Sequence, residues 1–152
     1  MGLHAAELAE SSVILLTVSD TALAPLASDL AQHRERWLGK VVLHTSGALP
    51  SDVLRPLRMR GASVGSLHPF QTVPTAAVGL RNLSGCFWGI EGDRRACEVA
   101  TALARALDGT PFRVKPSWRL LYHAAAVLSC GAVVALLDQS AHLLRAAAGV
   151  GA

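Results

Sequence analysis

The segment from Lys40 to Thr72 constrains the fold of this chain more than any other. It holds two short apolar runs, Val41–Leu43 and Ser63–Gly65, separated by a segment of helical character. A strand, a helix and a second strand in this order predict a parallel crossover, which places both strand ends at one edge of a sheet. Polar residues follow each run at that edge, where open α/β sheets bind ligands. The segment therefore predicts a ligand-binding edge in an α/β fold.

The rest of the chain extends this pattern and then changes character. Alternating apolar runs, capping residues and turn residues predict further strands and helices up to Lys115, and a single long helix rich in small residues after it. Gly131 is the expected weak point of that helix. The other expected elements are a fully buried strand over Val13–Val18, a helix over Thr21–Trp37, a helix over Asp52–Arg60 capped by Ser51, a stiff loop over Pro69–Pro74, a strand over Gly85–Glu91, a helix over Arg94–Leu107 ended by Gly109, and a strand over Pro111–Val114.

The long helix contains an apolar run, Ala124–Leu137, that resembles a membrane span. The run is shorter than the roughly 20 residues that a bilayer requires, and His123 and Asp138 bracket it. We therefore expect a buried helix and no membrane association. Only 16% of the residues are charged, which suits a buried sheet or a helix that packs against a partner.

Charge and cysteine usage exclude several classes of protein. The net charge of +3 is small and dispersed, and its densest run, Arg55, Arg58 and Arg60, is expected to be a solvated helix face. No nucleic-acid motif accompanies that run, so no nucleic-acid partner is expected. The cysteines lack metal or disulfide spacing, which predicts reduced thiols in a cytoplasmic protein and no metal site. They are Cys86, Cys97 and Cys130.

Two candidate ligand groups follow predicted strands, and each also has a structural explanation. Val18, Ser19 and Asp20 end the first strand, where a dinucleotide-binding sheet faces its cofactor. Ser19 or Asp20 would equally cap the following helix. Thr45 and Ser46 precede a glycine, which permits close approach of a ligand to the backbone. The same Ser-Gly pair is also typical of a turn.

Histidines supply the other two candidates. His68 precedes a proline that would hold it rigidly for proton transfer near neutral pH, although it would equally satisfy loop carbonyls. His123 lies near the start of the long helix with Tyr122, and Ser129 shares its face approximately. Its side chain faces either the sheet edge or solvent. Nucleophilic catalysis by Ser46 with His68 is also conceivable, but no acidic third member is marked.

Four stretches of sequence together resemble a known family. They are VILLTVSD, GKVVLHTSGALPSDVLRPLRMRGASVGSLHPFQT, IEGD and LYHAAAVLS, in order over nearly the whole chain. The chain resembles Rossmann-like proteins with a C-terminal domain of unknown function, number 2520, in the 6-phosphogluconate dehydrogenase-like superfamily. Relatives include pyrroline-carboxylate reductase and prephenate dehydrogenase. The resemblance implies an α/β fold, a partial Rossmann-type parallel sheet over residues 1–115 followed by the start of an all-helical dimerisation domain over 116–152.

The resemblance also implies roles for individual residues. His68, Ser46 and His123 match positions that line the active-site cleft, and are the expected catalytic residues. The expected cofactor is NADP or NAD, with a small-molecule substrate and a homodimer formed through the C-terminal helix. By position, the residues expected near the cofactor are Val18, Ser19, Asp20 and Thr45, and Gln71 is expected to bind substrate.

One departure from the family qualifies these expectations. Family members begin with a strand, a GxGxxG loop and a helix that hold the cofactor pyrophosphate, and nothing before Val13 supplies them. We therefore expect a truncated relative of an NAD(P)-dependent oxidoreductase that binds its cofactor poorly. The absence of these elements would also leave one edge of the first strand unpaired. The alternative is a non-catalytic dimerising remnant or interaction module.

Overall fold

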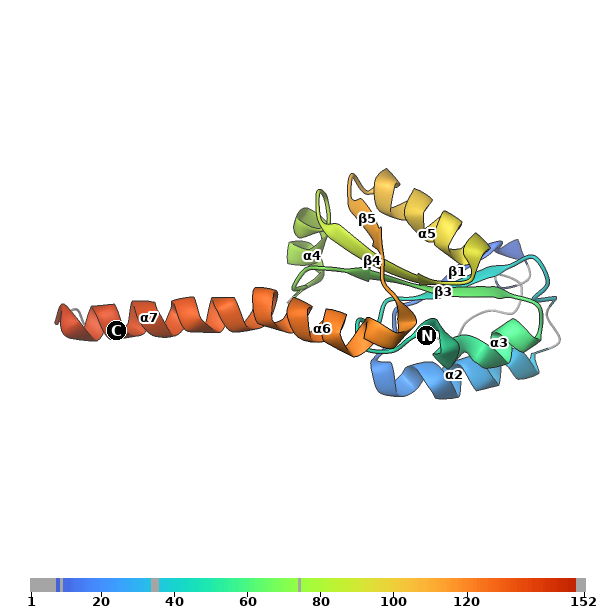
Figure 1. Cartoon of the computed structure of the whole chain (residues 1–152), viewed down its shortest axis with the longest axis horizontal. Coiled ribbons are helices and arrows are strands. Elements are labelled where there is room, and N and C mark those ends of the chain that lie inside the picture. Colours follow the sequence, from blue (N-terminus) through green and yellow to red (C-terminus); the bar gives the residue numbers. More distant parts are fainter. Residues whose placement is uncertain (1–7, 9, 34–35, 74, 150–152) are drawn as a thin grey trace.

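The computed structural model describes residues 8, 10–33, 36–73 and 75–149, and shows five strands in one sheet (Figure 1). The strands lie side by side in sequence order, β1-β2-β3-β4-β5. All neighbours are parallel except β3 and β4, which are antiparallel. The predicted α/β fold with a helical C-terminal segment is confirmed. The strands are β1 Val13–Leu16, β2 Val41–His44, β3 Ser63–Pro69, β4 Phe87–Gly92 and β5 Thr110–Arg113.

The first three strands end at the same edge of the sheet. Leu16 pairs with His44, which in turn pairs with Ser66. Between β2 and β3 the chain forms a 3-10 helix, η1 (Ser51–Leu54), and a short helix, α3 (Arg55–Met59). This is the parallel crossover that the sequence predicts. The polar residues after β1, β2 and β3 therefore meet at one edge.

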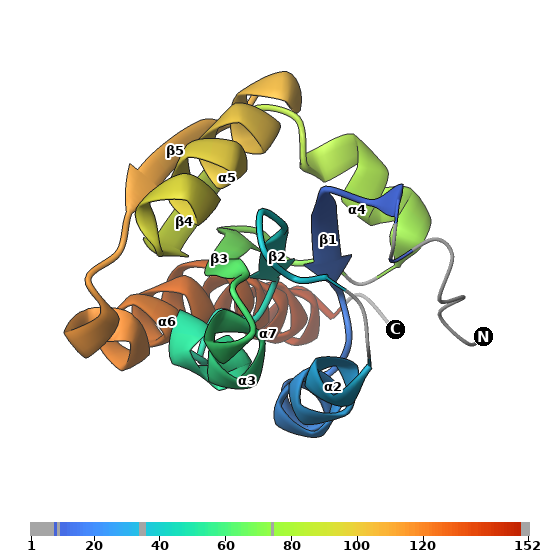
Figure 2. The ribbon, with the colours of Figure 1, turned by 90° about the vertical axis from the view of Figure 1, so that its right-hand side faces the viewer.

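Helices cover both faces of the sheet (Figure 2). Helix α2 (Asp20–Gln32) and α3 lie on one face, and α5 (Arg94–Ala106) lies on the other. Because side chains alternate along a strand, β2 contributes to both layers. Val42 packs with α2 and α3, whereas Val41 and Leu43 pack with the α5 layer.

Burial of the first strand differs from the prediction. Only alternate residues of β1 are buried, and Val13 and Leu15 are 38% and 45% exposed. Within the described residues, β1 is an edge strand with β2 as its neighbour and α2 over one face. The expectation of a fully buried strand is therefore wrong, because burial depends on covering layers that the apolar run does not itself encode.

Three helix boundaries also differ from the prediction. Helix α2 ends at Gln32, before the predicted Trp37. Ser51 does not cap a helix with its side chain, because that side chain binds Glu91 instead. After α5, Asp108 rather than Gly109 takes the left-handed conformation, with φ of 58°. The buried side of α5 is Ala96, Cys97, Ala100 and Ala104, whereas Leu103 and Leu107 are exposed.

The connection between β3 and β4 contains a helix that the sequence analysis missed. Helix α4 (Ala76–Asn82) begins after Thr75, whose side chain accepts a hydrogen bond from the Val78 amide at 3.3 Å. Of the predicted stiff loop over Pro69–Pro74, the first residue ends β3 and Pro74 lies outside the described residues. In the sequence, a threonine able to act as a helix N-cap was the signal that could have predicted this helix.

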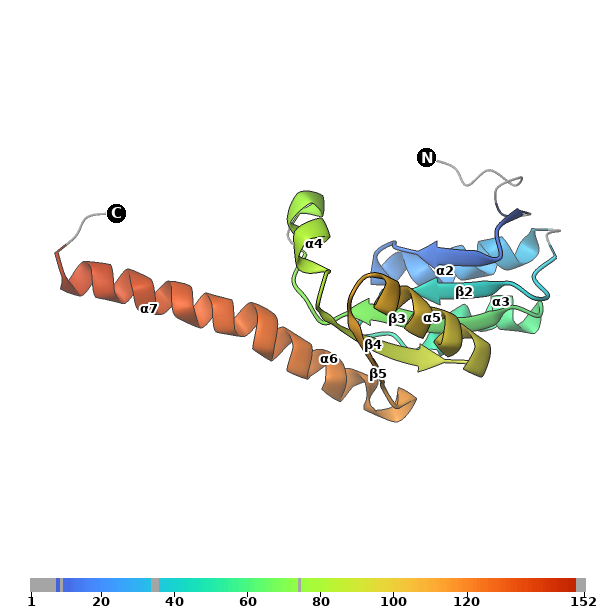
Figure 3. The same ribbon diagram turned by 90° about the horizontal axis from the view of Figure 1, so that it is seen from above.

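The C-terminal segment is one long helical rod that projects away from the sheet (Figure 3). A 3-10 turn, η2 (Pro116–Trp118), leads into α6 (Arg119–Val127), a π-helical turn η3 (Leu128–Ala132) and α7 (Val133–Ala147). Gly131, the expected weak point, lies in the π-helical turn, an irregularity of the kind that interrupts long helices.

The expectation that this helix is buried is wrong. No residue of α7 is buried, since no element of the described chain covers it, and its large apolar side chains are exposed. They include Leu136, Leu137, Leu143 and Leu144, each at least 65% exposed. The apolar run is also part of a 32-residue helix, Pro116–Ala147, which by length and composition alone would suffice to cross a membrane. The expectation that this segment is too short to span a bilayer is therefore wrong for the helix as a whole.

Candidate functional site

The carboxyl edge of β2 carries a buried histidine and a tight turn. His44 ends β2 with no exposed surface, and its Nδ1 accepts a hydrogen bond from the Ser46 amide at 3.2 Å. The Ser46 hydroxyl accepts from the Leu49 amide at 3.0 Å. Ser46 therefore stabilises the turn, the structural role that is typical of its Ser-Gly pair. The Ser46 hydroxyl can also donate one hydrogen bond, because its own proton is not used in this contact.

Helix α6 brings a second set of polar side chains against this edge. Tyr122 Oη lies 2.6 Å from Nδ1 of His68, at the end of β3. The ring of His123 is 6.2 Å from that of His68, measured between centroids, and their planes meet at 72°. The structure thus brings His68 and His123 together, from positions 55 residues apart in the chain.

Gly47 makes this arrangement possible. A Cβ atom at this position would lie 2.6 Å from Nδ1 of His123 and 2.6 Å from Nε2 of His68. Such distances are shorter than real Cβ atoms tolerate, so both rings occupy the space that a side chain would fill. The sequence predicted close approach of a ligand to this glycine, whereas the structure places two histidine nitrogens there.

A buried arginine, which the sequence analysis missed, links these groups. Arg119 is 2% exposed, and its Nη2 donates a hydrogen bond to the Ser46 carbonyl. Its guanidinium carbon lies 5.5 Å from the centre of the Tyr122 ring, a cation–π distance. Nε and Nη1 have no hydrogen-bond partner among the described residues. A lone charge at the start of an apolar helix, four residues before His123, was the available signal.

Burial and Arg119 set the protonation of the site. Burial lowers the pKa of His68 to about 4, Arg119 and His123 act in the same direction, and Asp20 opposes them. Burial and Arg119 likewise lower the pKa of His44 to about 4. Burial raises the pKa of Tyr122 to about 12. At neutral pH the site thus contains neutral His44 and His68 rings, a protonated phenol and one buried cation.

A pocket of about 190 Å³ opens beside the histidine pair. Three of the predicted site residues, His68, Gln71 and His123, line it together with Cys130 and Gly131. Nδ1 of His123 is buried and has no hydrogen-bond partner in the described part of the chain. A bound molecule would therefore meet the Gln71 amide and the rings of His68 and His123, whereas the unsatisfied Nδ1 of His123 lies buried against Gly47.

The other predicted residues do not line this pocket. Val18, Ser19 and Asp20 are exposed at the end of β1, and the carboxylate of Asp20 acts electrostatically on His68. Thr45 is half-buried after β2. Ser129 is not paired with His123, because its hydroxyl donates to the Ala125 carbonyl at 2.6 Å in its own helix.

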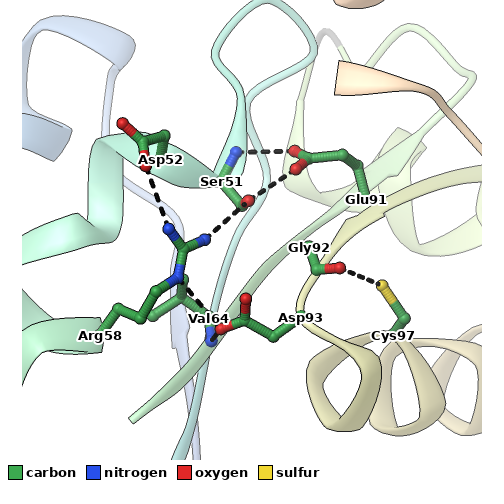
Figure 4. Close-up of polar contacts among 8 residues, drawn as sticks. All are labelled: Ser51, Asp52, Arg58, Val64, Glu91, Gly92, Asp93 and Cys97. Carbon is green, nitrogen blue, oxygen red and sulfur yellow. Dashed lines mark hydrogen bonds and ion pairs between the residues drawn. The ribbon is translucent and has the colours of Figure 1, made fainter. Parts of the chain in front are cut away.

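A buried carboxylate fixes the far end of the turn after β2 (Figure 4). Glu91 on β4 accepts hydrogen bonds from the Ser51 amide at 2.7 Å and the Ser51 hydroxyl at 2.6 Å. The turn is therefore held at Ser46 by Arg119 and at Ser51 by Glu91. Gly47, which supports both histidine rings, lies between these two anchors.

A second cluster in Figure 4 holds α3 to the sheet. Asp93 accepts from the Val64 amide at 2.8 Å and from Nε of Arg58 at 3.2 Å, and Arg58 also reaches Asp52 at 3.0 Å. Arg58 was expected on a solvated helix face, but it bridges two carboxylates instead.

In the parts of the chain that the structure describes, no cluster of three His, Cys, Asp or Glu side chains forms a metal site.

Two family models match the chain. Residues 3–69 match the Rossmann-like domain, and residues 86–151 match a domain of unknown function, DUF2520. No curated protein matches the chain. The boundary between the Rossmann-like domain and the helical domain, predicted after residue 115, stays a prediction.

Several solved structures share the fold. Protein TM1727 of Thermotoga maritima is 24% identical with a TM-score of 0.69, over 88% of this chain and 49% of that one. The provisionally named NADP oxidoreductase BF3122 of Bacteroides fragilis is 19% identical with a TM-score of 0.62, over 90% and 50%. Prephenate dehydrogenase of Aquifex aeolicus is 14% identical with a TM-score of 0.60, over 87% and 50%. The chain spans about half the length of each.

Proposed function

We propose that this chain, which combines a Rossmann-like domain with a DUF2520 domain, forms the substrate side of an NAD(P)-dependent oxidoreductase. The reaction would move a hydride to or from a C=O or C=N carbon of a small molecule. The observation that carries the proposal is the pocket lined by His68, Gln71 and His123 at the carboxyl end of β3. Open α/β sheets bind their ligands at this edge, and the fold is one that dehydrogenases share.

The end of β1 fits one part of the cofactor. Ser19 and Asp20 are exposed there, and the Ser19 side chain makes no cap hydrogen bond to α2. The Asp20 carboxylate is suited to accept hydrogen bonds from ribose hydroxyls, whereas its negative charge at the start of a helix disfavours a phosphate. We therefore assign Val18, Ser19, Asp20 and Thr45 to the ribose and nicotinamide end of NADP or NAD, which supplies or accepts the hydride when bound.

The pocket residues then have distinct roles. His68 faces the reacting oxygen or nitrogen through Nε2, and the ring of His123 lines the same pocket, with its unpartnered Nδ1 buried against Gly47. The Gln71 amide lines the pocket mouth and orients polar substrate groups. Ser46 keeps the turn beneath Gly47 in place and has one hydroxyl proton to donate. His68, Ser46 and His123 remain the proposed catalytic residues.

Calorimetric titration with NADPH and NADH tests the proposal. At least one dinucleotide should bind, and Asp20→Ala should weaken binding by roughly 10-fold or more, the effect of losing a hydrogen bond to a charged group. The matched control is Asp29→Ala, which removes a carboxylate of the same helix whose side chain is 71% exposed. Absence of binding by both dinucleotides at millimolar concentration would rule out a dehydrogenase role for this chain alone.

A second candidate function rests on the exposed rod. Leu136 and Leu143, and likewise Leu137 and Leu144, are seven residues apart and form one exposed apolar stripe along α7. An apolar stripe of this kind is typical of helices that pack against a partner helix. The chain would then be a dimerising module that joins two copies through α6 and α7.

Sedimentation velocity separates this candidate from a purely monomeric protein. We expect a dimer, and expect the double variant Leu137→Lys, Leu144→Lys to dissociate it. His142→Lys, on the side of α7 away from this stripe, is the matched control and should leave the dimer intact. A well-folded monomer contradicts the dimer, and a monomer that floats with lipid vesicles would show that the stripe contacts a membrane instead.

A further inference from the structure

We infer that Tyr122 is a positioning residue, which holds His68 as a ring protonated on Nε2 so that His68 meets the substrate as a neutral hydrogen-bond donor. This inference rests on the proposed function and gives His68 a more specific role in it. The argument starts from the contact between the Tyr122 hydroxyl and Nδ1 of His68, at 2.6 Å.

The position of the Tyr122 hydroxyl is defined from several directions. A Cβ atom at Gly89 would lie 2.5 Å from this oxygen and 2.7 Å from Cζ, so the hydroxyl reaches His68 only because residue 89 is glycine. The tyrosine ring packs against Phe70 and Phe112, with centroids 5.9 and 5.8 Å away. Arg119 lies against the same ring. The contact with His68 is therefore held by packing and is not a chance approach of two mobile side chains.

The hydrogen bond has a preferred direction. The phenol carries one proton, and among the described residues Nδ1 of His68 is the acceptor recorded for it. If the hydroxyl donates, Nδ1 must be the unprotonated nitrogen, and a neutral ring then carries its proton on Nε2. At neutral pH the phenol is protonated and the imidazole is neutral, because the pKa of Tyr122 is about 12 and that of His68 is about 4.

The surroundings of the pair keep the ring neutral. Arg119 and His123 both disfavour a positive charge on His68, and Asp20 opposes them only in part. The Nε2 side of the ring lies over Gly47 beside the pocket, where His123 and Gln71 also reach. A neutral N–H group at this place polarises a carbonyl or imine by stabilising the negative charge that develops on its oxygen or nitrogen. An imidazolium acid at neutral pH is not required.

Nitrogen-15 spectra of the histidine side chains test the inference without cofactor or substrate. At pH 7 the His68 signals should show an unprotonated Nδ1 and a protonated Nε2. Tyr122→Phe keeps the ring and its packing but removes the hydroxyl, and should shift the His68 signals toward a mixture of the two neutral forms. Phe112→Leu disturbs the same packing without removing a donor, and should leave the His68 form unchanged.

Two results would overturn the inference. One is a wild-type His68 that is protonated on Nδ1 or charged at pH 7, a measurement that does not depend on whether any variant folds. The other is a Tyr122→Phe variant with the wild-type His68 signals. Because Tyr122 is the sole tyrosine of the chain, its ultraviolet titration also reports directly whether the hydroxyl stays protonated above pH 10. Failure of dinucleotide binding would remove the proposed function but not this assignment of His68.

Discussion

Lowering the pH from 7 to 4 should reduce the free energy of unfolding by about 3 kcal/mol through His44 alone. His44 has no exposed surface, and burial together with Arg119 lowers its pKa from 6.5 to about 4. Below pH 6.5 the unfolded chain takes up a proton on this ring while the folded chain does not. The unfolded state is therefore favoured progressively as the pH falls, until the folded ring also protonates near pH 4.

Urea unfolding at several pH values between 4 and 7 measures this effect. His44→Gln removes the titrating group and should flatten the pH dependence by about the same amount. His142→Gln is the matched control, because His142 is exposed on α7 and its removal should not change the pH dependence. A wild-type protein whose stability is constant between pH 6.5 and 4 would contradict a neutral, buried His44. His68, whose pKa is lowered in the same direction, adds to the loss.

Replacing Gly47 by alanine should displace His68 and His123 together. The new Cβ atom would meet a nitrogen of each ring at 2.6 Å, so both rings must move or the turn after β2 must shift. Overpacking of this kind costs about 1–3 kcal/mol of stability. The turn cannot shift easily, since Arg119 and Glu91 hold it at either end. A misplacement of about 1 Å in a catalytic group lowers turnover roughly 100-fold.

Urea unfolding and the ring resonances of the two histidines measure the outcome. Gly131→Ala is the matched control, because Gly131 lines the pocket beside the two histidines but has open space where a Cβ atom would be. It should leave both histidine signals in place and change stability by less than about 1 kcal/mol. If Gly47→Ala behaves like Gly131→Ala, the two rings do not rest on Gly47.

The parts of the site that could be predicted are those encoded by short patterns. The apolar runs around Val42 and Val64 predicted a parallel crossover, and the crossover placed His68 at the correct edge. Tyr122 and His123 were singled out by their place on the long helix. The side chains that now define the site depend on how α6 docks, since the hydrogen bond between His68 and Tyr122 joins residues 54 positions apart. No local pattern specifies such a contact.

The errors of prediction have a common physical cause. Leu15 on β1 and Leu137 on α7 are apolar, and each was expected to be buried. Apolar composition shows that a segment favours burial, but the covering element must come from elsewhere in the fold or from a partner. The antiparallel direction of β4 relative to β3 was also not predicted, because it depends on the path of the chain through α4 and the turns around it. Arg119 was missed because its partners come from the turn after β2.

Titrating NADPH and NADH into the protein, while following the side-chain resonances of His68 and His123, tests most directly whether this edge is the reaction site. We expect at least one dinucleotide to shift both histidine signals, with the exposed His142 as an internal control that does not respond. Asp20→Ala should reduce the shift at a given concentration. Histidine signals that stay unchanged up to millimolar dinucleotide, or a change confined to His142, would contradict a nicotinamide-binding role for the carboxyl edge of the sheet.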